Sequence, residues 1–313
     1  MNVLICSAAR KVWLIDAFKS ALSESGGLVF AADADPLAVA LRVADGGLIL
    51  PCLNVAEYEQ VLLQECKKHN IQLIIPTRDA ELTWFSERLG FFALHGIQVM
   101  LSSSESVRIC QDKLSFCLHC ECYGYSVPKR AVSLTDKPEY PLFARPRTGA
   151  GGRGTCRIND DVSLQQLTPW SQWLIQELIE KPEYTLDLFA DFEGRVLSVV
   201  PRQRLRVVAG ESTVGVTVEA PYLIERAISL AQSLHLVGHN TLQCFWDGGE
   251  PLWIEINPRY GGGASLGFAA GANTPLMLLR LLAGEEVLPC IGEYERGLYL
   301  YRYSTDLYVR GAM

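Results

Sequence analysis

The stretch from Leu252 to Arg259, L-W-I-E-I-N-P-R, sets residue types that bind metals and phosphates at a regular spacing. Alternate side chains of a strand point to opposite faces. The expected site face carries Trp253, Glu255 and Asn257, and the expected core face carries Leu252, Ile254 and Ile256. A carboxylate and an amide oxygen two residues apart, followed by the cation Arg259, can hold an oxygen-liking metal beside a phosphate. The stretch predicts a site for a metal ion bound together with a nucleotide. The alternative is an edge strand whose polar face is exposed to solvent.

Two upstream segments carry chemistry of the same kind. The strand at 140–145 runs into R-T-G-A-G-G-R-G, a loop that can bring backbone N–H groups close to phosphate oxygens. Its glycines are Gly149, Gly151, Gly152 and Gly154. The spacing matches neither a P-loop nor G-x-G-x-x-G, so a plain hairpin stays open as the alternative. Further on, W-L-I-Q-E-L-I-E-K-P-E-Y-T-L-D breaks at 180–182 into a second strand, and Glu183, Thr185 and Asp187 share one face of it.

The order of these motifs along the chain is specific. It runs through Asp112-Lys113, Arg145 with the glycine loop, Gln176 to Glu183, Gln243, and Glu255 to Arg259. In this order the chain resembles the ATP-grasp superfamily. Within it, the nearest arrangement is one synthetase half of the carbamoyl-phosphate synthase large chain, together with the Rossmann-like domain that precedes the grasp fold. The likeness covers nearly all of the chain, but not the duplication, the effector domain or the glutaminase partner of that enzyme.

The resemblance implies an ATP site between two lobes. Lys113 and Arg145 would lie along the triphosphate, and the loop 149–154 would close over the β- and γ-phosphates. Backbone groups of the hinge between the lobes, residues 176–178, would read adenine, Leu178 would pack on its ring, and Glu183 would accept hydrogen bonds from the ribose. The implied ATP-binding set is Lys113, Arg145, Gly149, Gly151, Gly152, Gln176, Glu177, Leu178 and Glu183. Arg259, with Arg145, would steady the transferring phosphoryl group.

The same resemblance implies Mg²⁺, for which Mn²⁺ would substitute, with Gln243, Glu255 and Asn257 as ligands. A two-residue turn at 248–249 would pair Gln243 with Ile254, whereas a three-residue loop at 248–250 pairs Gln243 with Glu255. We predict the longer loop. Many ATP-grasp enzymes have an acid at the position of Gln243, so this site, with one anionic ligand, should depend on the charge of the nucleotide to hold its metal.

Short apolar runs alternate with amphipathic stretches in the first third of the chain and predict a doubly wound parallel sheet. The expected strands are 3–8, 28–33, 48–51, 73–77 and 99–101, and the expected helices are 11–24, 55–69 and 79–92. No glycine occurs in the first turn, 7–11, so a nicotinamide cofactor is disfavoured. We expect a Rossmann-like domain at 1–102 and a two-lobed ATP-grasp domain at 103–313. Its β-rich small lobe would span about 127–172 and its large lobe about 173–313, with a helix at 264–284.

Several charged residues are candidates for contact with the acid substrate. Arg10, Arg78, Asp79 and Glu81 follow the carboxyl ends of expected strands. The alternative is helix capping by Asp79 and solvent exposure of the two arginines. Arg202, Arg204 and Arg206 recur at period two, and Arg204 and Arg206 are the candidates to bind the acid. A charged edge strand that discourages aggregation is the alternative there.

Composition bounds the partners. The chain has 313 residues, 49% hydrophobic and 20% charged, and a net charge of −7 without a basic block, which disfavours nucleic acid. No apolar run is long enough to span a bilayer, so no membrane partner is expected. Ten cysteines without a secretion signal indicate reduced thiols in the cytoplasm. The group Cys110, Cys117, Cys120, Cys122 and His119 reads as a helix face of buried thiols rather than zinc, because no second C-x-x-C pair follows.

The residues and the resemblance together predict an ATP-dependent carboxylate–amine ligase that forms an amide through an acyl phosphate and releases ADP and phosphate. Its partners would be a small-molecule carboxylate and an amine, with a homodimer as a compatible assembly. One alternative is an enzyme of carbamoyl-phosphate synthase type that phosphorylates a carboxylate or carbamate. Another is a nucleotide-binding module without turnover, against which the complete set Gln243, Glu255, Asn257 and Arg259 argues.

Overall fold

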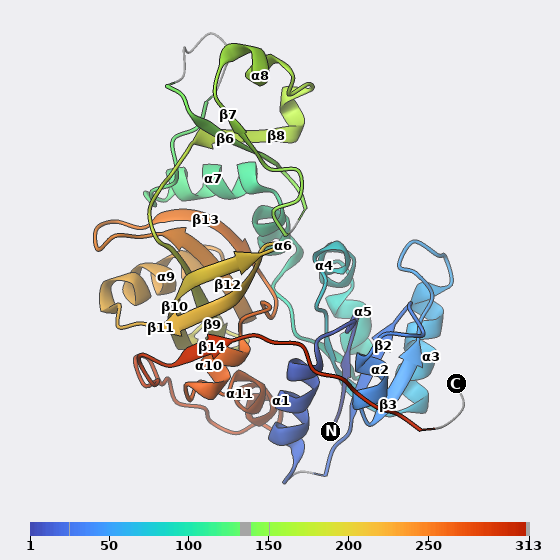
Figure 1. Ribbon diagram of the computed structural model, residues 1–313. Coiled ribbons are helices and arrows are strands. Elements are labelled where there is room, and N and C mark those ends of the chain that lie inside the picture. The colour runs from blue at the N-terminus through green and yellow to red at the C-terminus, as the bar shows by residue number, and fades with distance from the viewer. Residues whose placement is uncertain (25, 132–138, 150, 311–313) are drawn as a thin grey trace.

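A computed structural model gives the structure of the chain and describes residues 1–24, 26–131, 139–149 and 151–310. It contains three sheets (Figure 1). The first is parallel with the strand order β3-β2-β1-β4-β5, which confirms the predicted Rossmann-like sheet. Its elements are β1 (Asn2–Ile5), α1 (Val12–Leu22), β2 (Val29–Asp33), α2 (Ala40–Val43), β3 (Gly46–Ile49), α3 (Tyr58–Lys68), β4 (Ile71–Ile75), α4 (Asp79–Ser86), α5 (Leu89–Leu94) and β5 (Gln98–Val99). The helix predicted at 79–92 is therefore two helices.

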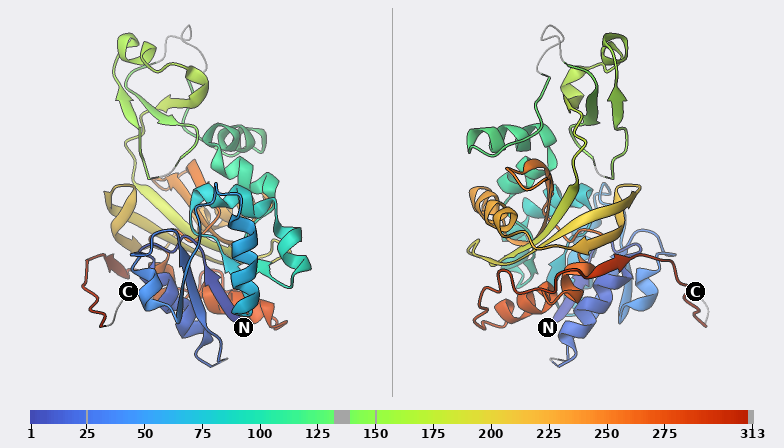
Figure 2. Two further views of the ribbon diagram at one scale, coloured as in Figure 1. Left: turned by 90° about the vertical axis from the view of Figure 1, so that its right-hand side faces the viewer. Right: turned by 60° about the vertical axis from the view of Figure 1, so that its left-hand side comes forward.

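Two helices, α6 (Ser104–Gln111) and α7 (Lys113–Cys122), lead to a three-stranded antiparallel sheet with the order β7-β6-β8. This sheet stands away from the rest of the molecule in both views of Figure 2. Its elements are β6 (Leu142–Pro146), β7 (Cys156–Ile158), α8 (Asp161–Gln165), the 3-10 turn η2 (Trp170–Gln172) and β8 (Trp173–Glu177). A separate small core holds it together, built on Leu142, Ala144, Ile158, Leu164 and Ile175.

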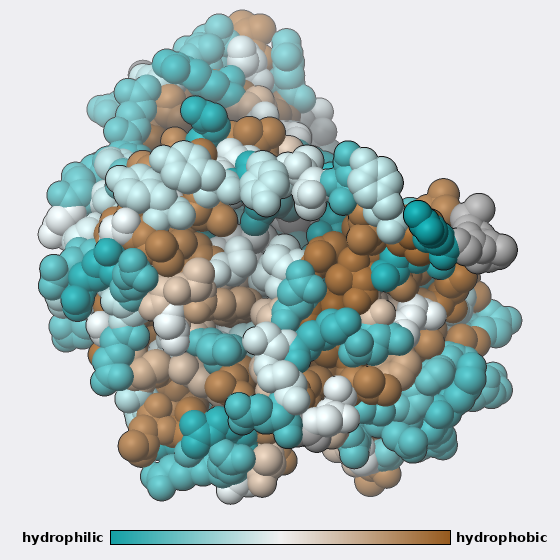
Figure 3. Space-filling view, turned by 60° about the horizontal axis from the view of Figure 1, so that its bottom comes forward, coloured by the Kyte–Doolittle hydropathy of each residue, from teal (hydrophilic) through white to brown (hydrophobic). Residues whose placement is uncertain are grey.

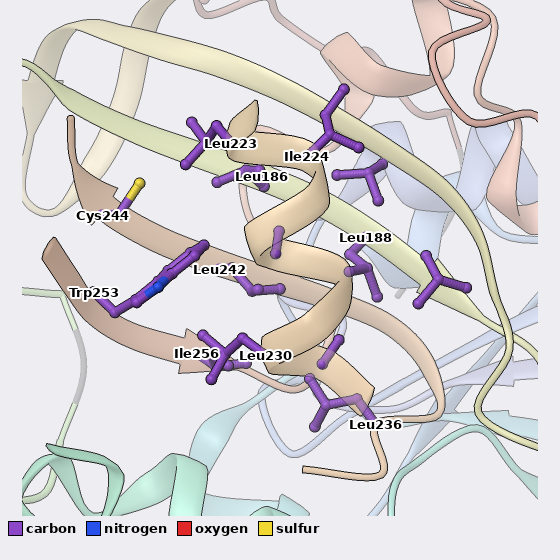
Figure 4. Packing of buried hydrophobic residues seen from close by; sticks show 14 of the residues in the cluster. Leu186, Leu188, Leu223, Ile224, Leu230, Leu236, Leu242, Cys244, Trp253 and Ile256 are labelled. Atoms are coloured by element: carbon purple, nitrogen blue, oxygen red, sulfur yellow. The ribbon is translucent and has the colours of Figure 1, made fainter. Parts of the chain in front are cut away.

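The third sheet has six antiparallel strands in the order β13-β12-β9-β10-β11-β14. Its elements are β9 (Glu183–Ala190), β10 (Val196–Val208), β11 (Glu211–Thr217), α9 (Pro221–Ser233), β12 (Gly238–Phe245), β13 (Leu252–Asn257), α10 (Ser265–Ala269), α11 (Thr274–Leu282) and β14 (Tyr299–Tyr301). One face packs on α9 (Figure 4). The predicted helix 264–284 is broken into α10 and α11, because Gly271 has a φ of +108° and Asn273 caps a new helix.

The alternation predicted for 252–257 is wrong at its start. Gln243 pairs with Glu255 as expected, but Cys244 pairs with Trp253, so Ile254 is an extra residue in a β-bulge. The hairpin loop is 246–251 rather than the predicted 248–250, and the bulge sets the Gln243 register instead. Because one inserted residue reverses the alternation, Trp253 is fully buried beside Ile256 and α9 (Figure 4). Ile254 lines a cavity on the other side.

No described helix is long and apolar enough to cross a membrane. On the face shown in Figure 3, hydrophilic side chains surround smaller apolar patches. The core between the first sheet and the C-terminal helices is continuous, since it joins Val3 and Ile5 of β1 to Tyr260 and Leu278. This packing fixes the first sheet beside the loop that follows β13.

Candidate functional site

The centre of the site is the carboxylate of Glu255, where two of the predicted phosphate-binding cations converge. Its Oε2 lies 3.7 Å from a terminal nitrogen of Arg145 and 4.0 Å from Nζ of Lys113. Lys113 is the first residue of α7, while Arg145 lies on β6, so α7 and the small sheet each contribute one cation. Burial lowers the pKa of both groups, and the charge of Glu255 opposes that shift.

Arg145 is 5% exposed and is held in place by neutral groups. Its second terminal nitrogen donates to Oε1 of Gln176 at 3.1 Å and to the carbonyl of Ile254 at 2.9 Å. The bulge therefore has a direct role in the site, because Ile254 presents its carbonyl to this guanidinium. The side-chain amide of Gln176, a residue of β8, in turn donates to the carbonyl of Pro128 at 2.9 Å, and this hydrogen bond fixes the orientation of the amide.

A cavity of about 210 Å³ lies next to Arg145, and the predicted hinge lines it. Its lining residues are Pro128, Phe143, Arg145, Gln176, Glu177, Leu178, Ile179, Phe245 and Ile254. Most of these side chains are apolar, and the hinge backbone provides donors and acceptors, which suits a planar heterocycle such as adenine. One carboxylate oxygen of Glu177 accepts a hydrogen bond from the backbone N–H of Lys129 at 2.8 Å.

The glycine loop, apart from residue 150, which lies outside the described residues, meets the site at two points. Nζ of Lys113 donates to the carbonyl of Gly149 at 2.8 Å. Gly210, in the turn between β10 and β11, faces Gly151 so closely that a Cβ on Gly210 would lie 2.6 Å from the Gly151 Cα. Gly149, Gly151 and Gly152 all have positive φ, which glycine adopts at little cost. A backbone with this conformation can turn its N–H groups toward an anion.

The three predicted metal ligands lie on the paired strands β12 and β13. Gln243 sits directly opposite Glu255, and Nδ2 of Asn257 donates to Oε1 of Glu255 at 3.2 Å. One carboxylate and two amide oxygens are donors of the kind that Mg²⁺ accepts. They fit the ion only with further negative charge, because Lys113 and Arg145 already neutralise Glu255.

The three arginines on β10 do not form one row. Arg202 is buried and binds Asp187, with Nε to Oδ2 at 2.8 Å. Arg204 pairs with Oε1 of Glu183 at 3.2 Å and donates to the carbonyl of Gly210 at 2.9 Å. Arg206 is exposed. Register shifts on either side of Arg206 interrupt the alternation that period two assumes.

Glu183, the predicted ribose ligand, therefore has a protein partner. Burial raises the pKa of Glu183, and the charge of Glu255 adds to that effect, while Arg204 opposes it. A carboxylate that is paired with Arg204 and partly exposed can still accept hydrogen bonds from hydroxyl groups.

Arg259 binds Asp79, a residue of the first sheet's domain, through two parallel hydrogen bonds. Its Nε donates to Oδ1 at 2.8 Å and its terminal nitrogen to Oδ2 at 2.7 Å. That nitrogen also reaches Oδ1 of Asn257 at 3.4 Å. The structure thus brings Asp79, through Arg259, next to the predicted metal ligand Asn257, although Asp79 and Arg259 are 180 residues apart along the chain.

The other candidates from the first domain behave differently. Arg10 and Arg78 are exposed. Glu81 is 3% exposed and stabilises the fold, since its Oε1 accepts hydrogen bonds from the backbone N–H groups of Thr77 and Arg78 at 2.7 and 3.0 Å. Lys11, which follows the first strand and is not among the predicted candidates, is the half-buried cation at this position.

The predicted face of buried thiols is confirmed for Cys110, Cys117 and Cys120, although Cys110 lies on α6 and the other two on α7. Burial raises the pKa of Cys110 to about 12 and that of Cys117 to about 11. The sulfur of Cys117 accepts a hydrogen bond from the side-chain amide of Gln176. Cys122 is exposed. These thiols are packing residues behind the hinge.

A parallel Rossmann-like sheet, followed by a small antiparallel lobe and a larger antiparallel sheet with a cavity of about 210 Å³ between them, is the ATP-grasp fold. Comparisons with known proteins agree. Residues 3–100 match the model of the PylC-like N-terminal domain, and residues 170–299 match that of the ATP-grasp in the biosynthetic pathway with Ter operon. These matches support an ATP-grasp protein that is similar to the carbamoyl phosphate synthase large chain.

The relatives define how far this likeness reaches. The carbamoyl phosphate synthase large chain of Gemmatimonas aurantiaca is 24% identical over 218 residues, which are 61% of this chain and 20% of that one. The biotin carboxylase domain dimer of Hydrogenobacter thermophilus 2-oxoglutarate carboxylase, solved with MgADP, ADP and bicarbonate, has a TM-score of 0.72 at 17% identity, over 95% of this chain and 73% of that one. An L-amino acid ligase from Bacillus licheniformis has a TM-score of 0.65 at 18% identity, over 89% and 73%. The chain spans about a fifth of the curated relative's length.

Proposed function

We propose that the chain is an ATP-dependent carboxylate–amine ligase, which forms an acyl phosphate, then an amide, and releases ADP and phosphate. The observation that carries this proposal is the convergence of Lys113 and Arg145 on Glu255, at 4.0 and 3.7 Å, beside the hinge cavity. Fixed cations at one end and an apolar cavity at the other match the two ends of ATP. The division at 102/103, the lobes at about 127–172 and 173–313, and a homodimer stay predictions.

In this proposal adenine occupies the hinge cavity, and Glu183 accepts from the ribose. Lys113, Arg145 and the glycine loop hold the phosphates. Gln243, Glu255 and Asn257 would hold Mg²⁺ or Mn²⁺, which would neutralise charge on the phosphates. An oxygen of the acid attacks the γ-phosphorus in line as the bond to ADP breaks. The amine then attacks the acyl carbon, loses a proton and expels phosphate.

A second candidate is phosphorylation of a carboxylate or bicarbonate with release of the acyl phosphate itself. Similarity to the carbamoyl phosphate synthase large chain favours this candidate, and similarity to the L-amino acid ligase fold favours amide formation. The two candidates share the first chemical step. They differ in whether an amine is consumed.

The test is an ADP-release screen of carboxylates against amines, with hydroxylamine as a trap. Ligase activity predicts that ADP release needs both an acid and an amine, and that hydroxylamine converts the intermediate to a hydroxamate. Release with acid alone would favour the second candidate. Stoichiometric AMP, or an acyl adenylate, would overturn both, and no nucleotide turnover with any pair would leave only a nucleotide-binding module.

A further inference from the structure

The six-stranded sheet has one edge that the described part of the chain leaves open. β13 forms the opposite edge, but α6 and α7 pack against this strand, and its Trp253 donates a backbone N–H to the carbonyl of Ser126 at 2.9 Å. β14 pairs with β11 on one side only (Figure 1). The segment after it, 303–310, makes no backbone hydrogen bond to another described residue. β14 is therefore a sheet edge to which a further strand can be added.

The backbone of β14 presents its outward hydrogen-bonding groups at the odd-numbered residues. The N–H of Arg302 and the carbonyl of Leu298 are bonded to β11, at 2.8 and 3.0 Å, so the even-numbered residues face β11. Successive residues of an antiparallel strand direct their backbone groups to opposite sides. The N–H and carbonyl groups of Tyr299, Tyr301 and Tyr303 therefore point away from the sheet.

The side chains of this edge suit an interface. Tyr299, Tyr301 and Tyr303 share one face and are 54%, 68% and 84% exposed, and the rings of the first two stack with their centroids 6.1 Å apart. Exposed edge strands of soluble proteins usually carry a lysine, a proline or an unpaired charge that discourages pairing. The stretch 298–303 has only Arg302, whose guanidinium is paired with a carboxylate of β11 at 2.5 Å. Nothing in this edge opposes the addition of a strand.

The direction of these backbone groups restricts how two copies of the edge can pair. A two-fold axis brings the same surface of both copies together, and the two strands are then antiparallel. Outward-facing residues must lie opposite one another, so the axis passes through a residue and not between two residues. An axis through Tyr301 places Tyr301 opposite its own copy and Tyr299 opposite Tyr303. This register forms a ladder of aromatic side chains on one face.

Charge distinguishes the axis through Tyr301 from its neighbours. This axis places Arg296 opposite Asp306 of the second copy, and both residues are exposed in the single chain. Opposite charges directly across two strands stabilise their pairing, and like charges destabilise it. An axis one residue earlier removes this match, and an axis one residue later places Arg302 opposite its own copy. The edge is therefore complementary to itself in one register.

We propose that β14, continued by the segment after it, is the contact surface for a second copy of this chain, paired antiparallel about a two-fold axis through Tyr301. The three tyrosines of the ladder expose roughly 400 Å² per copy, at about 200 Å² for one aromatic side chain. The contact is then at the small end of specific interfaces, which bury about 1,200–2,000 Å², and we expect a Kd of roughly micromolar size. The pairing joins the two large sheets and does not depend on the proposed function.

Sedimentation equilibrium of the full chain across the micromolar range tests the dimer. We expect Tyr301→Pro to weaken dimerisation by at least about tenfold, because it removes both central N–H donors of the two-fold pair. The fold of the single chain should persist, since this N–H points away from the sheet, and circular dichroism of dilute protein checks it. Tyr308→Ser is the matched control. It removes an exposed tyrosine outside the ladder and should change the Kd less than about threefold.

Cross-linking tests the register and decides the matter if Tyr301→Pro fails to fold. Tyr301→Cys places two thiols across the axis, where Cα atoms of a hydrogen-bonded pair are about 5.5 Å apart, within reach of a disulfide. The two copies of Tyr299→Cys would be about 13 Å apart along the strands. Mild oxidation should link Tyr301→Cys into a dimer faster than Tyr299→Cys or the wild type, whose native exposed cysteines give the background. A monomer at every concentration, a dimer that folded Tyr301→Pro leaves unchanged, or equal cross-linking in both cysteine variants would overturn the proposal.

Discussion

Glu255 is the residue on which the proposed metal site depends, because it is the only carboxylate among the three predicted ligands. We expect Glu255→Gln to keep the fold and to lower kcat for ADP release by at least about 100-fold. The reason is that a bound metal ion stabilises the transition state by several kcal/mol. Circular dichroism checks the fold and a coupled assay checks the rate. Gln243→Glu is the matched variant and should tighten Mn²⁺ binding in the absence of nucleotide. Near wild-type turnover in Glu255→Gln would remove the metal assignment.

The Glu183–Arg204 pair places both residues at the nucleotide end. Glu183→Ala should raise KM for ATP with little change in kcat, because ribose contacts are made equally in the ground and transition states. Arg204→Ala should also raise KM for ATP. In the double variant, the free-energy loss calculated from KM should be smaller than the sum of the losses in the two single variants, because the two residues are in direct contact. Steady-state kinetics with ATP and acid varied separately gives these values.

The outcome for Arg204 also tests an earlier expectation. If Arg204 holds the acid substrate, as its sequence position predicts, Arg204→Ala would raise KM for the acid rather than for ATP. Arg206→Ala provides the comparison, because Arg206 is exposed and has no ion pair among the described residues. Unchanged acid dependence in both variants would leave them with the charged-edge interpretation.

At the scale of elements, the bulge in β13 decides which side chains reach the site. It buries Trp253 in the core with α9 and leaves Leu252 half-buried. Trp253→Ala should therefore cost about 3–5 kcal/mol of unfolding free energy, whereas Trp253→Phe should cost well under half of that. Urea unfolding measures both. A loss under about 1 kcal/mol for Trp253→Ala would favour the regular alternation, which places Trp253 on the site face.

The buried pair of Asp187 on β9 and Arg202 on β10 makes the large sheet sensitive to acid. Burial raises the pKa of Asp187, but the charge and hydrogen bonds of Arg202 and the nearby His239, whose Nε2 lies 3.8 Å from Oδ1, outweigh it and lower the pKa to about 2. Since the folded pKa is depressed, the stabilisation is present above about pH 4 and is lost as the pH falls toward 2. It amounts to roughly 2 kcal/mol.

Urea midpoints between pH 5 and pH 2 measure this contribution. Asp187→Asn should be about 3–5 kcal/mol less stable at neutral pH, because Arg202 is left buried without a partner. It should also lose less stability than wild type between pH 4 and pH 2. Parallel pH profiles for the two proteins would contradict the depressed pKa.

At the scale of the whole molecule, the pair of Asp79 and Arg259 joins the first domain to the proposed phosphoryl end of the site. Asp79→Asn should lower kcat by about 10- to 100-fold and leave KM for ATP near its wild-type value, because a guanidinium held at one point instead of two loses its orientation. Asp79→Glu should recover part of the rate. An increase in KM for ATP alone, with kcat intact, would mean that the pair serves packing and not positioning.

The sequence by itself determined the class of fold and named the residues of the candidate nucleotide site. Apolar runs of strand length between amphipathic stretches specify a parallel sheet from local information. Motifs in fixed order, from Lys113 to Arg259, identified cations and oxygen donors that the structure brings together around Glu255. Such residues are visible in sequence because phosphate and metal chemistry restricts which types can serve.

Tertiary structure decided the rest, because it depends on interactions between residues far apart in the chain. The bulge at Ile254 arises where β12, β13 and Arg145 meet, and local alternation carries no sign of it. The separate partners of Arg202 and Arg204 come from neighbouring strand β9. Lys11 rather than Arg10 is the half-buried cation after β1, where the first sheet packs against the C-terminal helices. Sequence names the residues that can do chemistry, and long-range packing selects which of them face one another.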